Sequence, residues 1–382
     1  MNMVKRIYQR YFRRFKLFRS LSMLLKRGRY RLKRGRAQPT WRHTSLRKQS
    51  LGHICMAVIC DDMTWMTLQG VCDLVYLTPE NWQESLEKHK PVLLFCEAAW
   101  QGTEESRYCW EGRIAHDVQI WGENRFVLKD ILRYCKAAGI HTVFWNKEDP
   151  SSDNELYRFT DTAYLFDHIC TTAEECISRY QAQGHKSVHL LPFGYSPRLF
   201  YPIEEPGEKH TAVFFGSWYQ KFPQRCEDTV RLFDFVLERG MKLIIYDRSS
   251  GQDDPERRFP ERYQPYIRDA VPYTEIRNEL KKYQYVLNLN TETQSDTMFA
   301  RRVFEIMACG RMIISNHSAG MKRLFPDSVW YLDQPFDIGR ADEYIAENQR
   351  TVSQYFTVTN HITQLLQDIG VLKIKEEIKE KK

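Results

Sequence analysis

Short apolar runs alternate with helix-like segments along most of the chain, and this alternation constrains the fold more than any other feature. Residues 54–60 and 92–96 are apolar throughout, whereas residues 124–138 have helical periodicity and end at Gly139. A strand that is apolar throughout is buried on both faces, as in a parallel sheet covered by helices on both sides. The pattern therefore predicts an α/β fold built on parallel sheets.

A turn-rich segment interrupts this pattern. Residues 191–197 read Leu-Pro-Phe-Gly-Tyr-Ser-Pro and are followed by Pro202 and by Pro206-Gly207. Proline and glycine end helices and strands, so the segment is typical of a domain boundary. Because strand-like and helix-like segments resume at residue 212, we predict two doubly wound, Rossmann-like domains at residues 49–200 and 201–345. We expect them to face a cleft, with a helical tail at residues 346–382.

The first 48 residues differ from the rest in charge. They contain 17 of the 56 Lys and Arg residues and none of the 49 acidic residues. The remainder therefore carries 39 basic and 49 acidic groups, a net charge of −10. The sequence combines a mildly acidic body with a basic arm.

Apolar residues recur every three or four positions in this arm, which predicts a basic amphipathic helix. Those on the apolar face are Val4, Ile7, Tyr8, Tyr11, Phe15, Phe18, Leu21 and Leu25. Such a helix can lie in the headgroup region of an anionic membrane, and we expect residues 1–36 to contact that surface. Two alternatives remain open: residues 26–36 bind nucleic-acid phosphates, or the arm is a solvated leader. Because the body has no recognised nucleic-acid module, nucleic acid is the least favoured partner.

Several absences restrict the chemistry and the compartment. No apolar run reaches the roughly 18–20 residues that span a bilayer, and charges interrupt every possible signal-peptide core. The ten cysteines form no CxxC pair and are expected to be reduced, as in a cytoplasmic protein. GxGxxG, P-loop, HExxH and Asp-x-Asp motifs are absent, so we expect neither a catalytic metal nor a bound cofactor.

Residues 295–310 are the most informative segment. They predict a helix from residue 296 to 309, with Ser295 or Asp296 as N-cap and Gly310 as C-cap. The helix follows a predicted strand at residues 285–289, and ligands of open α/β sheets bind beyond the carboxyl ends of strands. A carboxylate at Glu305 can accept bonds from sugar hydroxyls there, and Arg302 can supply a cation to a pyrophosphate leaving group.

The pattern Arg302-x-Phe304-Glu305-x-x-Ala308-Cys309-Gly310, followed by an apolar strand, resembles the donor-site helix of GT-B glycosyltransferases. Residues 61–64, 94–100, 144–150, 191–194 and 215–219 resemble motifs of the spore-maturation CgeB-like branch. The resemblance covers roughly residues 52–335. It implies a GT-B fold and a nucleotide-sugar donor, with retention of anomeric configuration, and we expect the donor to be UDP-linked. One departure concerns this last point, because Thr297 stands where retaining relatives often have a second glutamate.

The resemblance assigns donor-binding roles by position. It makes Glu305 the ligand of the ribose hydroxyls and places Gly216 and Ser217 in the turn that approaches the phosphates. A tight turn that needs glycine explains Gly216 equally well. The cations expected around the diphosphate are Lys221, Arg225, Arg301 and Arg302.

Three acidic residues, Asp61, Glu97 and Asp149, end predicted strands of the first domain. Carboxyl ends of parallel strands meet at one edge, so these residues are candidate catalytic groups that orient or deprotonate an acceptor hydroxyl. Alternatively, Asp61 caps a helix and Asp149 begins a turn. On the acceptor side we expect Trp100, Trp145 and Asn146, although lone tryptophans also belong to cores.

The sequence thus predicts a metal-independent glycosyltransferase of the hexosyltransferase type. Residues 49–200 form the acceptor-side domain and residues 201–345 the nucleotide-sugar-binding domain. The acceptor is a glycan, a lipid-linked precursor of a surface polysaccharide, or a protein, and the enzyme is cytoplasmic and peripheral at the inner face of the membrane. Two alternatives share the fold: a nucleotide-sugar epimerase and a non-catalytic peripheral membrane scaffold.

Overall fold

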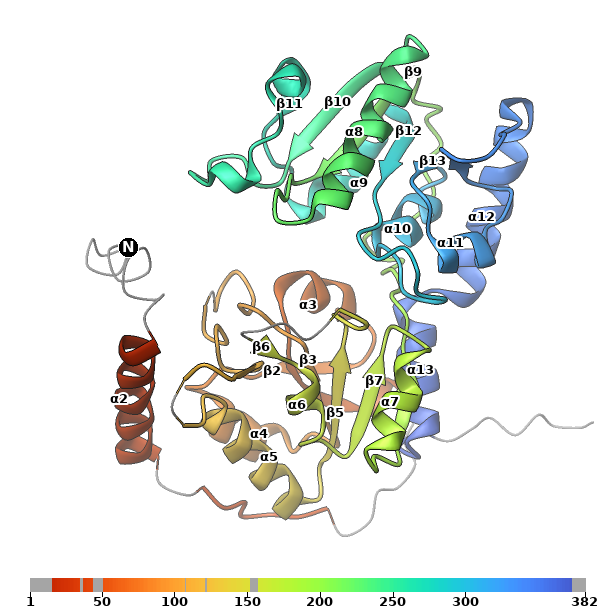
Figure 1. The fold of residues 1–382 in the computed structure, drawn as a ribbon. Helices are drawn as coiled ribbons and strands as arrows, with labels where there is room; N and C mark the ends of the chain where they lie inside the picture. Colours follow the sequence, from red (N-terminus) through yellow and green to blue (C-terminus); the bar gives the residue numbers. More distant parts are fainter. Residues whose placement is uncertain are drawn as a thin grey trace, which may run out of the picture. The chain divides into compact units, whose positions relative to one another are not determined.

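The computed structural model describes residues 16–34, 37–43, 51–106, 108–120, 122–151 and 157–372 of the chain. These residues form two compact units (Figure 1). Unit 1 contains the described residues up to Thr172, Cys176–Leu191 and those from Ile362 onward; unit 2 contains Ala173–Glu175 and Pro192–His361. The chain enters unit 2 at Pro192, inside the turn-rich segment.

Unit 1 is built on a sheet of six parallel strands in the order β2-β1-β3-β5-β7-β8. Its strands are β1 (Cys55–Ile59), β2 (Asp73–Tyr76), β3 (Leu93–Glu97), β5 (His141–Asn146), β7 (His168–Thr171) and β8 (Val188–Leu190). A small antiparallel pair, β4 (His116–Asp117) and β6 (Tyr157–Arg158), lies apart from this sheet. β1 and β3 are almost entirely buried, as expected for strands covered on both faces.

The helices of unit 1 follow its strands in the alternating manner predicted. They are α2 (Lys16–Arg34), α3 (Asp62–Leu68), α4 (Trp82–His89), α5 (Phe126–Ala138), α6 (Thr160–Ala163), α7 (Cys176–Ala182) and, from Ile362 onward, α13 (Val358–Asp368). A short 3-10 helix, η2 (Leu51–His53), precedes β1. α5 ends as predicted, because Gly139 adopts a left-handed conformation with φ 73°.

Unit 2 contains a second sheet of six parallel strands in the order β11-β10-β9-β12-β13-β14. The strands are β9 (Glu208–Gly216), β10 (Lys242–Asp247), β11 (Ile267–Arg268), β12 (Tyr283–Asn288), β13 (Met312–Ser315) and β14 (Trp330–Tyr331). Numbered along the chain, this is the Rossmann order 3-2-1-4-5-6. The two units therefore confirm the predicted fold class, an α/β fold with two doubly wound Rossmann-like domains.

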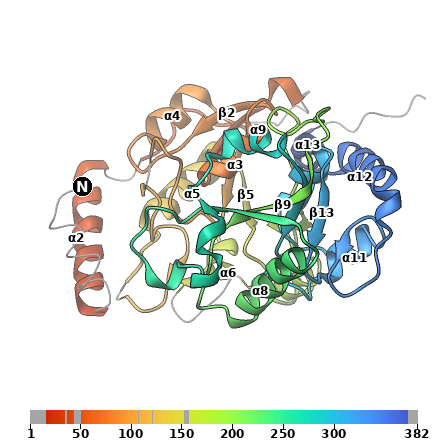
Figure 2. The ribbon, with the colours of Figure 1, turned by 90° about the horizontal axis from the view of Figure 1, so that it is seen from above.

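The helices of unit 2 cover its sheet and include a long C-terminal helix that was predicted as a tail. They are α8 (Pro223–Glu238), α9 (Ile276–Leu280), α10 (Arg302–Ala308), α11 (Ala319–Leu324) and α12 (Ala341–Tyr355), with 3-10 helices η3 (Pro255–Arg257), η4 (Glu261–Tyr266), η5 (Tyr273–Glu275) and η6 (Ile338–Arg340). α11 and α12 lie on the β13 side of the unit (Figure 2). α12 buries Tyr344 and Val352 in the core of unit 2, so the chain divides differently from the predicted boundaries at residues 200 and 345.

Two predicted helices are shorter in the structure. The helix expected at residues 296–309 begins only at Arg302. Before it, the Ser295 hydroxyl accepts the backbone N–H of Met298 at 3.0 Å, and the Asn290 side chain accepts that of Ala300 at 2.9 Å. These side chains replace helical hydrogen bonds and hold the segment in an irregular conformation. The alternation of strands and helices also predicts a helix near residues 154–166; of its described residues, only Thr160–Ala163 form the helix α6, and residues 152–156 lie outside the described part.

The predicted arm and tail are only partly described. Residues 16–34 form helix α2, whereas residues 1–15 of the predicted amphipathic helix, and residues 373–382 of the tail, lie outside the described residues. All ten cysteines are free thiols. Among the described residues, no helix has the length and apolar character needed to cross a membrane.

Candidate active site

Each sheet has a switch point, a pair of neighbouring strands from which the strand order proceeds toward one edge on one side and toward the other edge on the other side. In unit 1 it lies between β1 and β3, and in unit 2 between β9 and β12. Ligands of doubly wound sheets bind beyond the carboxyl ends of strands at such points. Charged side chains gather at both positions, and each group is a candidate site of its own unit.

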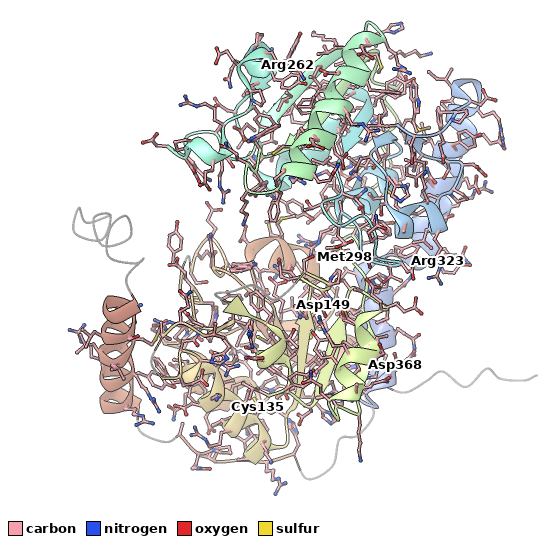
Figure 3. The ribbon with its side chains drawn as sticks, in the orientation of Figure 1. Cys135, Asp149, Arg262, Met298, Arg323 and Asp368 are labelled. Carbon is pink, nitrogen blue, oxygen red and sulfur yellow. The ribbon has the colours of Figure 1, made fainter. Side chains whose placement is uncertain are left out.

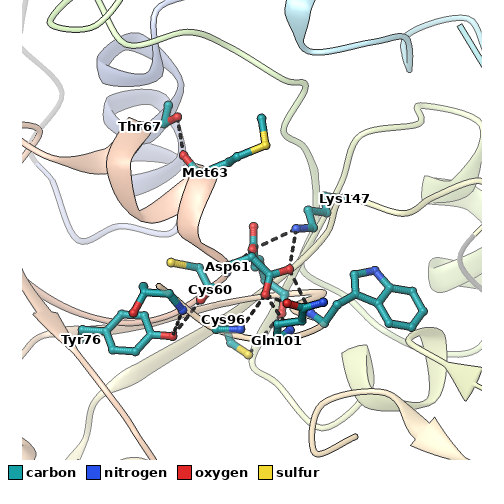
Figure 4. A network of polar contacts seen from close by, with 12 residues as sticks. Cys60, Asp61, Met63, Thr67, Tyr76, Cys96, Gln101 and Lys147 are labelled. Atoms are coloured by element: carbon teal, nitrogen blue, oxygen red, sulfur yellow. Dashed lines mark hydrogen bonds and ion pairs between the residues drawn. The ribbon is translucent and has the colours of Figure 1, made fainter. Parts of the chain in front are cut away.

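In unit 1, Asp61, Glu97 and Lys147 form what we call the acid–lysine cluster. Asp61 follows β1, Glu97 ends β3, and Lys147 follows β5. The Lys147 ammonium group lies 3.2 Å from Asp61 Oδ2 and 3.0 Å from Glu97 Oε1 (Figure 4). One cation thus joins two carboxylates that the sequence predicted to converge.

Asp61 is held firmly as an anion. Its carboxylate accepts the backbone N–H groups of Trp100 at 2.9 Å, Gln101 at 2.8 Å and Gly102 at 2.8 Å. Although Asp61 occupies the N-cap position of α3, its side chain makes no capping bond to that helix. Burial raises the pKa of Asp61, but Lys147 and the three N–H groups outweigh it, so this pKa lies below its usual value.

Glu97 differs from Asp61 in having one unused oxygen. The side chain is fully buried, and Oε1 accepts the Asp61 backbone N–H at 2.5 Å in addition to Lys147. Oε2 is buried and has no hydrogen-bond partner among the described residues. Because Oε2 is unused, Glu97 retains the accepting capacity that Asp61 has used up.

Glu148 is a further acidic residue beside this cluster. Burial raises the pKa of Glu148, and the charge of Lys147 and a hydrogen bond from Trp100 only partly oppose this shift.

The third predicted acid, Asp149, takes part in a different network. Its carboxylate is fully buried (Figure 3) and accepts four side-chain donors: Asn146 Nδ2 at 3.0 Å, Thr171 Oγ1 at 2.7 Å, Arg179 Nη2 at 2.7 Å and Tyr180 OH at 2.9 Å. So many donors leave this carboxylate little capacity for a ligand. Asn146 is equally buried and belongs to the same network. Both residues thus contribute to the interior of unit 1.

The two candidate tryptophans lie in different environments. Trp145 is buried against Phe95, with ring centroids 5.9 Å apart, and its indole N–H donates to the Leu191 carbonyl at 2.9 Å. This is the core position that the sequence left open as the alternative. Trp100 is 40% exposed and stands edge-on to Phe159, with ring centroids 4.9 Å apart. Of the two, Trp100 alone presents a ring to solvent.

In unit 2, three arginines surround Tyr219, which follows β9; we call these four residues the arginine–tyrosine cluster. Arg248 donates to the Tyr219 hydroxyl at 2.9 Å. The guanidinium carbons of Arg225 and Arg257 lie 5.3 Å and 5.0 Å from the centre of its ring. Burial raises the pKa of Tyr219, but the charges of Arg248, Arg257 and Arg225 outweigh it, and this pKa lies below its usual value. The shift reports a strongly positive environment.

The predicted residues after β9 lie beside this cluster. Arg225 donates to Thr291 Oγ1 at 2.7 Å and, more weakly, to the Ser217 carbonyl at 3.4 Å. Ser217 is buried and accepts a bond from the Ser249 hydroxyl at 2.8 Å. A side chain at Gly216 would approach the Phe214 ring to 2.4 Å, so packing alone requires glycine there. Lys221 is exposed over the Phe222 ring, 4.8 Å from its centre.

Helix α10 adds a buried carboxylate and another cation. Glu305 is 2% exposed, and its Oε1 accepts the Tyr273 hydroxyl at 2.6 Å. Burial raises the pKa of Glu305, against the hydrogen bond from Tyr273 and the charges of Arg302 and Arg301. Burial also lowers the pKa of Arg302 to about 10; Glu305 opposes this shift, and Arg248 adds to it. Arg302 is therefore electrostatically coupled to the arginine–tyrosine cluster, whereas Arg301 lies over Phe193, 5.1 Å from its ring centre.

Sequence reasoning missed four members of the two groups and one residue that contacts Glu305. The four are Lys147, Tyr219, Arg248 and Arg257, and the residue that contacts Glu305 is Tyr273. A signal existed for two of them, because Lys147 and Arg248 directly follow β5 and β10. Examining every charged residue just after a predicted strand would have found both.

The two groups have different chemical capacities. Guanidinium groups bind phosphate oxygens through paired, charge-assisted hydrogen bonds, so the arginine–tyrosine cluster suits a phosphorylated ligand. A carboxylate with a free lone pair suits the binding or deprotonation of a hydroxyl group, as in the acid–lysine cluster. Among the described residues, no group of three or more His, Cys, Asp or Glu side chains is arranged to hold a metal ion.

Comparison with known proteins gives one family match. The family described as "Glycosyl transferase-like" matches residues 240–367, most of which lie in unit 2. No curated protein matches the chain. The family match supports a glycosyltransferase-like domain in this part of the chain.

Several solved structures are similar to the chain at low sequence identity. HepE from Anabaena, solved with UDP-glucose, is 10% identical with a TM-score of 0.49, and the match covers 84% of this chain and all of that one (100%). A sucrose-phosphate synthase from Thermosynechococcus elongatus is 9% identical with a TM-score of 0.49, and the match covers 83% of this chain and 99% of that one. A GtfA/B complex is 16% identical with a TM-score of 0.42, over 64% of this chain and 55% of that one. The chain thus spans about half the length of the GtfA/B and TarM chains that it matches.

Proposed function

We propose that this chain is a glycosyltransferase that takes a nucleotide sugar as donor and transfers the sugar to an acceptor hydroxyl. The observation that carries the proposal is the arginine–tyrosine cluster at the switch point of unit 2. It lies where a doubly wound sheet binds its ligand, and Arg248 and Arg257 fall within the segment that matches the glycosyltransferase-like family. A cluster of cations there can stabilise the diphosphate that leaves when the sugar is transferred.

The donor is a nucleoside diphosphate sugar held by unit 2. Arg225, Arg248 and Arg302 neutralise the diphosphate, and Glu305, positioned by Tyr273, binds the ribose hydroxyls as the family resemblance implies. We further propose UDP as the nucleotide and a hexose as the sugar. The resemblance to the CgeB-like branch favours retention of configuration, and the absence of metal- and cofactor-binding motifs favours catalysis without metal or cofactor.

The acceptor binds to unit 1 near the acid–lysine cluster. Asp61 is saturated with donors and Asp149 is enclosed in the core, so Glu97 is the carboxylate with remaining accepting capacity. We assign to the Glu97–Lys147–Asp61 group the orientation of the acceptor hydroxyl. The fixed charge of Lys147 keeps the two carboxylates together in a buried position.

The test of this proposal compares two arginines of the same helix. Arg225 belongs to the cluster, whereas the side chain of Arg231 is 63% exposed and pairs with Asp228 at 3.6 Å. In a thermal-shift titration, UDP should stabilise the wild-type protein and R231A equally. R225A should bind UDP on the order of tenfold more weakly, because a hydrogen bond to a charged group contributes roughly 1.5–3 kcal/mol. If neither UDP nor other nucleotides or nucleotide sugars shift the melting temperature of the wild type, the proposal fails.

The acceptor is a glycan, a lipid-linked glycan or a protein at the cytoplasmic face of a membrane. Helix α2 binds this membrane surface and so brings the enzyme to its acceptor. α2 contains eight Lys or Arg residues and no acidic residue. Leu21, Leu24 and Leu25 are 47%, 48% and 65% exposed, while Tyr30 packs on Phe126 with ring centroids 5.4 Å apart. Exposed leucines beside cations favour an anionic bilayer surface. Deleting residues 1–36 should abolish sedimentation with phosphatidylserine vesicles, and undiminished sedimentation would place the membrane contact elsewhere.

A further inference from the structure

A small cavity opens beside Trp100 in unit 1, next to the acid–lysine cluster. It has a volume of about 150 Å³, and its lining includes Trp100, Gln101, Glu111, Gly112 and Phe159. A cavity of this size holds a single six-membered ring, since an apolar protein cavity of about 150 Å³ accommodates benzene. The dimensions therefore suit one ring of a ligand rather than an entire nucleotide.

The walls of this cavity are fixed by hydrogen bonds within unit 1. On one side, the backbone N–H groups of residues 100–102 donate to the Asp61 carboxylate (Figure 4). The backbone N–H of Trp110 donates to the backbone carbonyl of Gln101 at 3.1 Å. On the other side, the fully buried Asn124 donates to the carbonyls of Gly112 at 3.0 Å and Ala115 at 2.6 Å. Such bonds hold a binding site in shape before the ligand arrives.

The lining combines two aromatic side chains, Trp100 and Phe159, with polar groups. Trp100 is 40% exposed, and the fully buried Phe159 supports it at an interplanar angle of 86°. The carboxylate of Glu111 and the amide of Gln101 supply hydrogen-bonding groups. At Gly112, where φ is 63°, an added Cβ would meet no atom within 4 Å, so the space beside this wall is open.

We infer that this cavity is a subsite for one pyranose ring of the acceptor. A pyranose has an apolar C–H face that packs on the electron-rich face of an indole, and hydroxyl groups at its edge that bond to a carboxylate and an amide. An entirely apolar ring would form no hydrogen bond with either of these side chains. A quaternary ammonium group prefers several aromatic faces around it, whereas Trp100 and Phe159 form a T-shaped pair in which an edge meets a face.

The inference rests on the proposed function and adds a location to it. Trp100 and Gln101, which line the cavity, also donate their backbone N–H groups to the Asp61 carboxylate. A ring in the subsite would therefore lie close to the Glu97–Lys147–Asp61 group, where an acceptor hydroxyl is to be oriented. The recognised chemistry is the sugar ring itself, whether free, on a lipid or within a longer glycan.

The experiment is saturation-transfer NMR on the full chain with methyl glycosides of glucose, galactose and N-acetylglucosamine. At least one glycoside should bind the wild type, and W100A should weaken that binding by about tenfold, because the stacking face is lost. E111Q should weaken it less, since glutamine still accepts a hydrogen bond. L190A, which also removes an exposed apolar side chain from unit 1, should bind as the wild type does. Comparing methyl with octyl glucoside distinguishes the source: equal affinity indicates a glycan ring, and tighter octyl binding indicates a lipid-linked one.

Two results would overturn the subsite. One is glycoside binding that W100A leaves unchanged, or no glycoside binding at all. The other is Trp100-dependent binding of uridine or choline in place of glycosides. UDP binding, measured by thermal shift on the same samples, separates this failure from that of the proposed function. If UDP stabilises both wild type and W100A but no glycoside binds, the subsite is wrong and the donor site stands; Trp100-dependent glycoside binding without any nucleotide binding supports the subsite and contradicts the transferase.

Discussion

The two units share a doubly wound design but place opposite chemistry at their switch points. In unit 1, two carboxylates at the carboxyl ends of β1 and β3 form ion pairs with one lysine, which follows β5. In unit 2, three arginines surround one tyrosine after β9 and β10, and a fourth, Arg302, adds to their field. A parallel sheet gathers whatever follows its strands at one edge, so a few loop residues decide whether that edge binds hydroxyl groups or phosphates.

The two groups also differ in how their charges are compensated. The acid–lysine cluster contains its own counter-charges: Lys147 balances part of the negative charge, and backbone N–H groups hold the rest. In the arginine–tyrosine cluster, the charges of Arg248, Arg257 and Arg225 hold the pKa of Tyr219 below its usual value. Burial lowers the pKa values of Arg225 and of the neighbouring Arg302, and the charge of Arg248 adds to both shifts, so these cations lie close together. Unit 2 therefore gains most from an anionic ligand, whereas unit 1 is balanced without one.

The largest effect that we predict follows from removing the cation of unit 1. In K147M, the fully buried Glu97 and the partly buried Asp61 would lose their shared counter-charge. Breaking a buried ion pair on one side costs about 3–5 kcal/mol, so the free energy of unfolding should fall by at least about 3 kcal/mol. Urea denaturation at pH 7 measures it, with K136M on the exposed side of α5 as the control. A loss below about 1 kcal/mol would show that the cluster is solvated rather than self-compensated.

The sequence predicts the scaffold of these groups better than the groups themselves. Continuous apolar strands and the turn at residues 191–197 are local signals, and the two sheets follow from them. Convergence of Asp61 and Glu97 is predictable too, since both directly follow strands of one parallel sheet. The position of Asp149 is not, because four donors from β5, β7 and α7 enclose it only in the folded unit. The ring of arginines around Tyr219 likewise depends on loops whose conformations no periodicity encodes.

A smaller effect concerns the pH dependence of ligand binding in unit 2. The pKa of Tyr219 lies below its usual value because of the surrounding arginines, so this hydroxyl ionises at lower pH than other tyrosines. Once ionised, Tyr219 places a negative charge where we propose the diphosphate binds, and it neutralises part of the attraction of Arg248. UDP affinity should therefore decrease as the pH rises toward 10, by a few-fold, in the wild type.

Replacing the hydroxyl tests which charge controls this decrease. Y219F cannot ionise and should retain its UDP affinity across pH 8–10, whereas Y355F, altered at an exposed tyrosine at the end of α12, should follow the wild type. Isothermal titration calorimetry at several pH values measures the difference. A decrease of equal size in Y219F would assign the pH dependence to another group and remove Tyr219 from the anion site. A wild-type affinity independent of pH up to 10 would mean that the arginines are compensated in some other way, and the contrast in charge compensation between the two units would then fail.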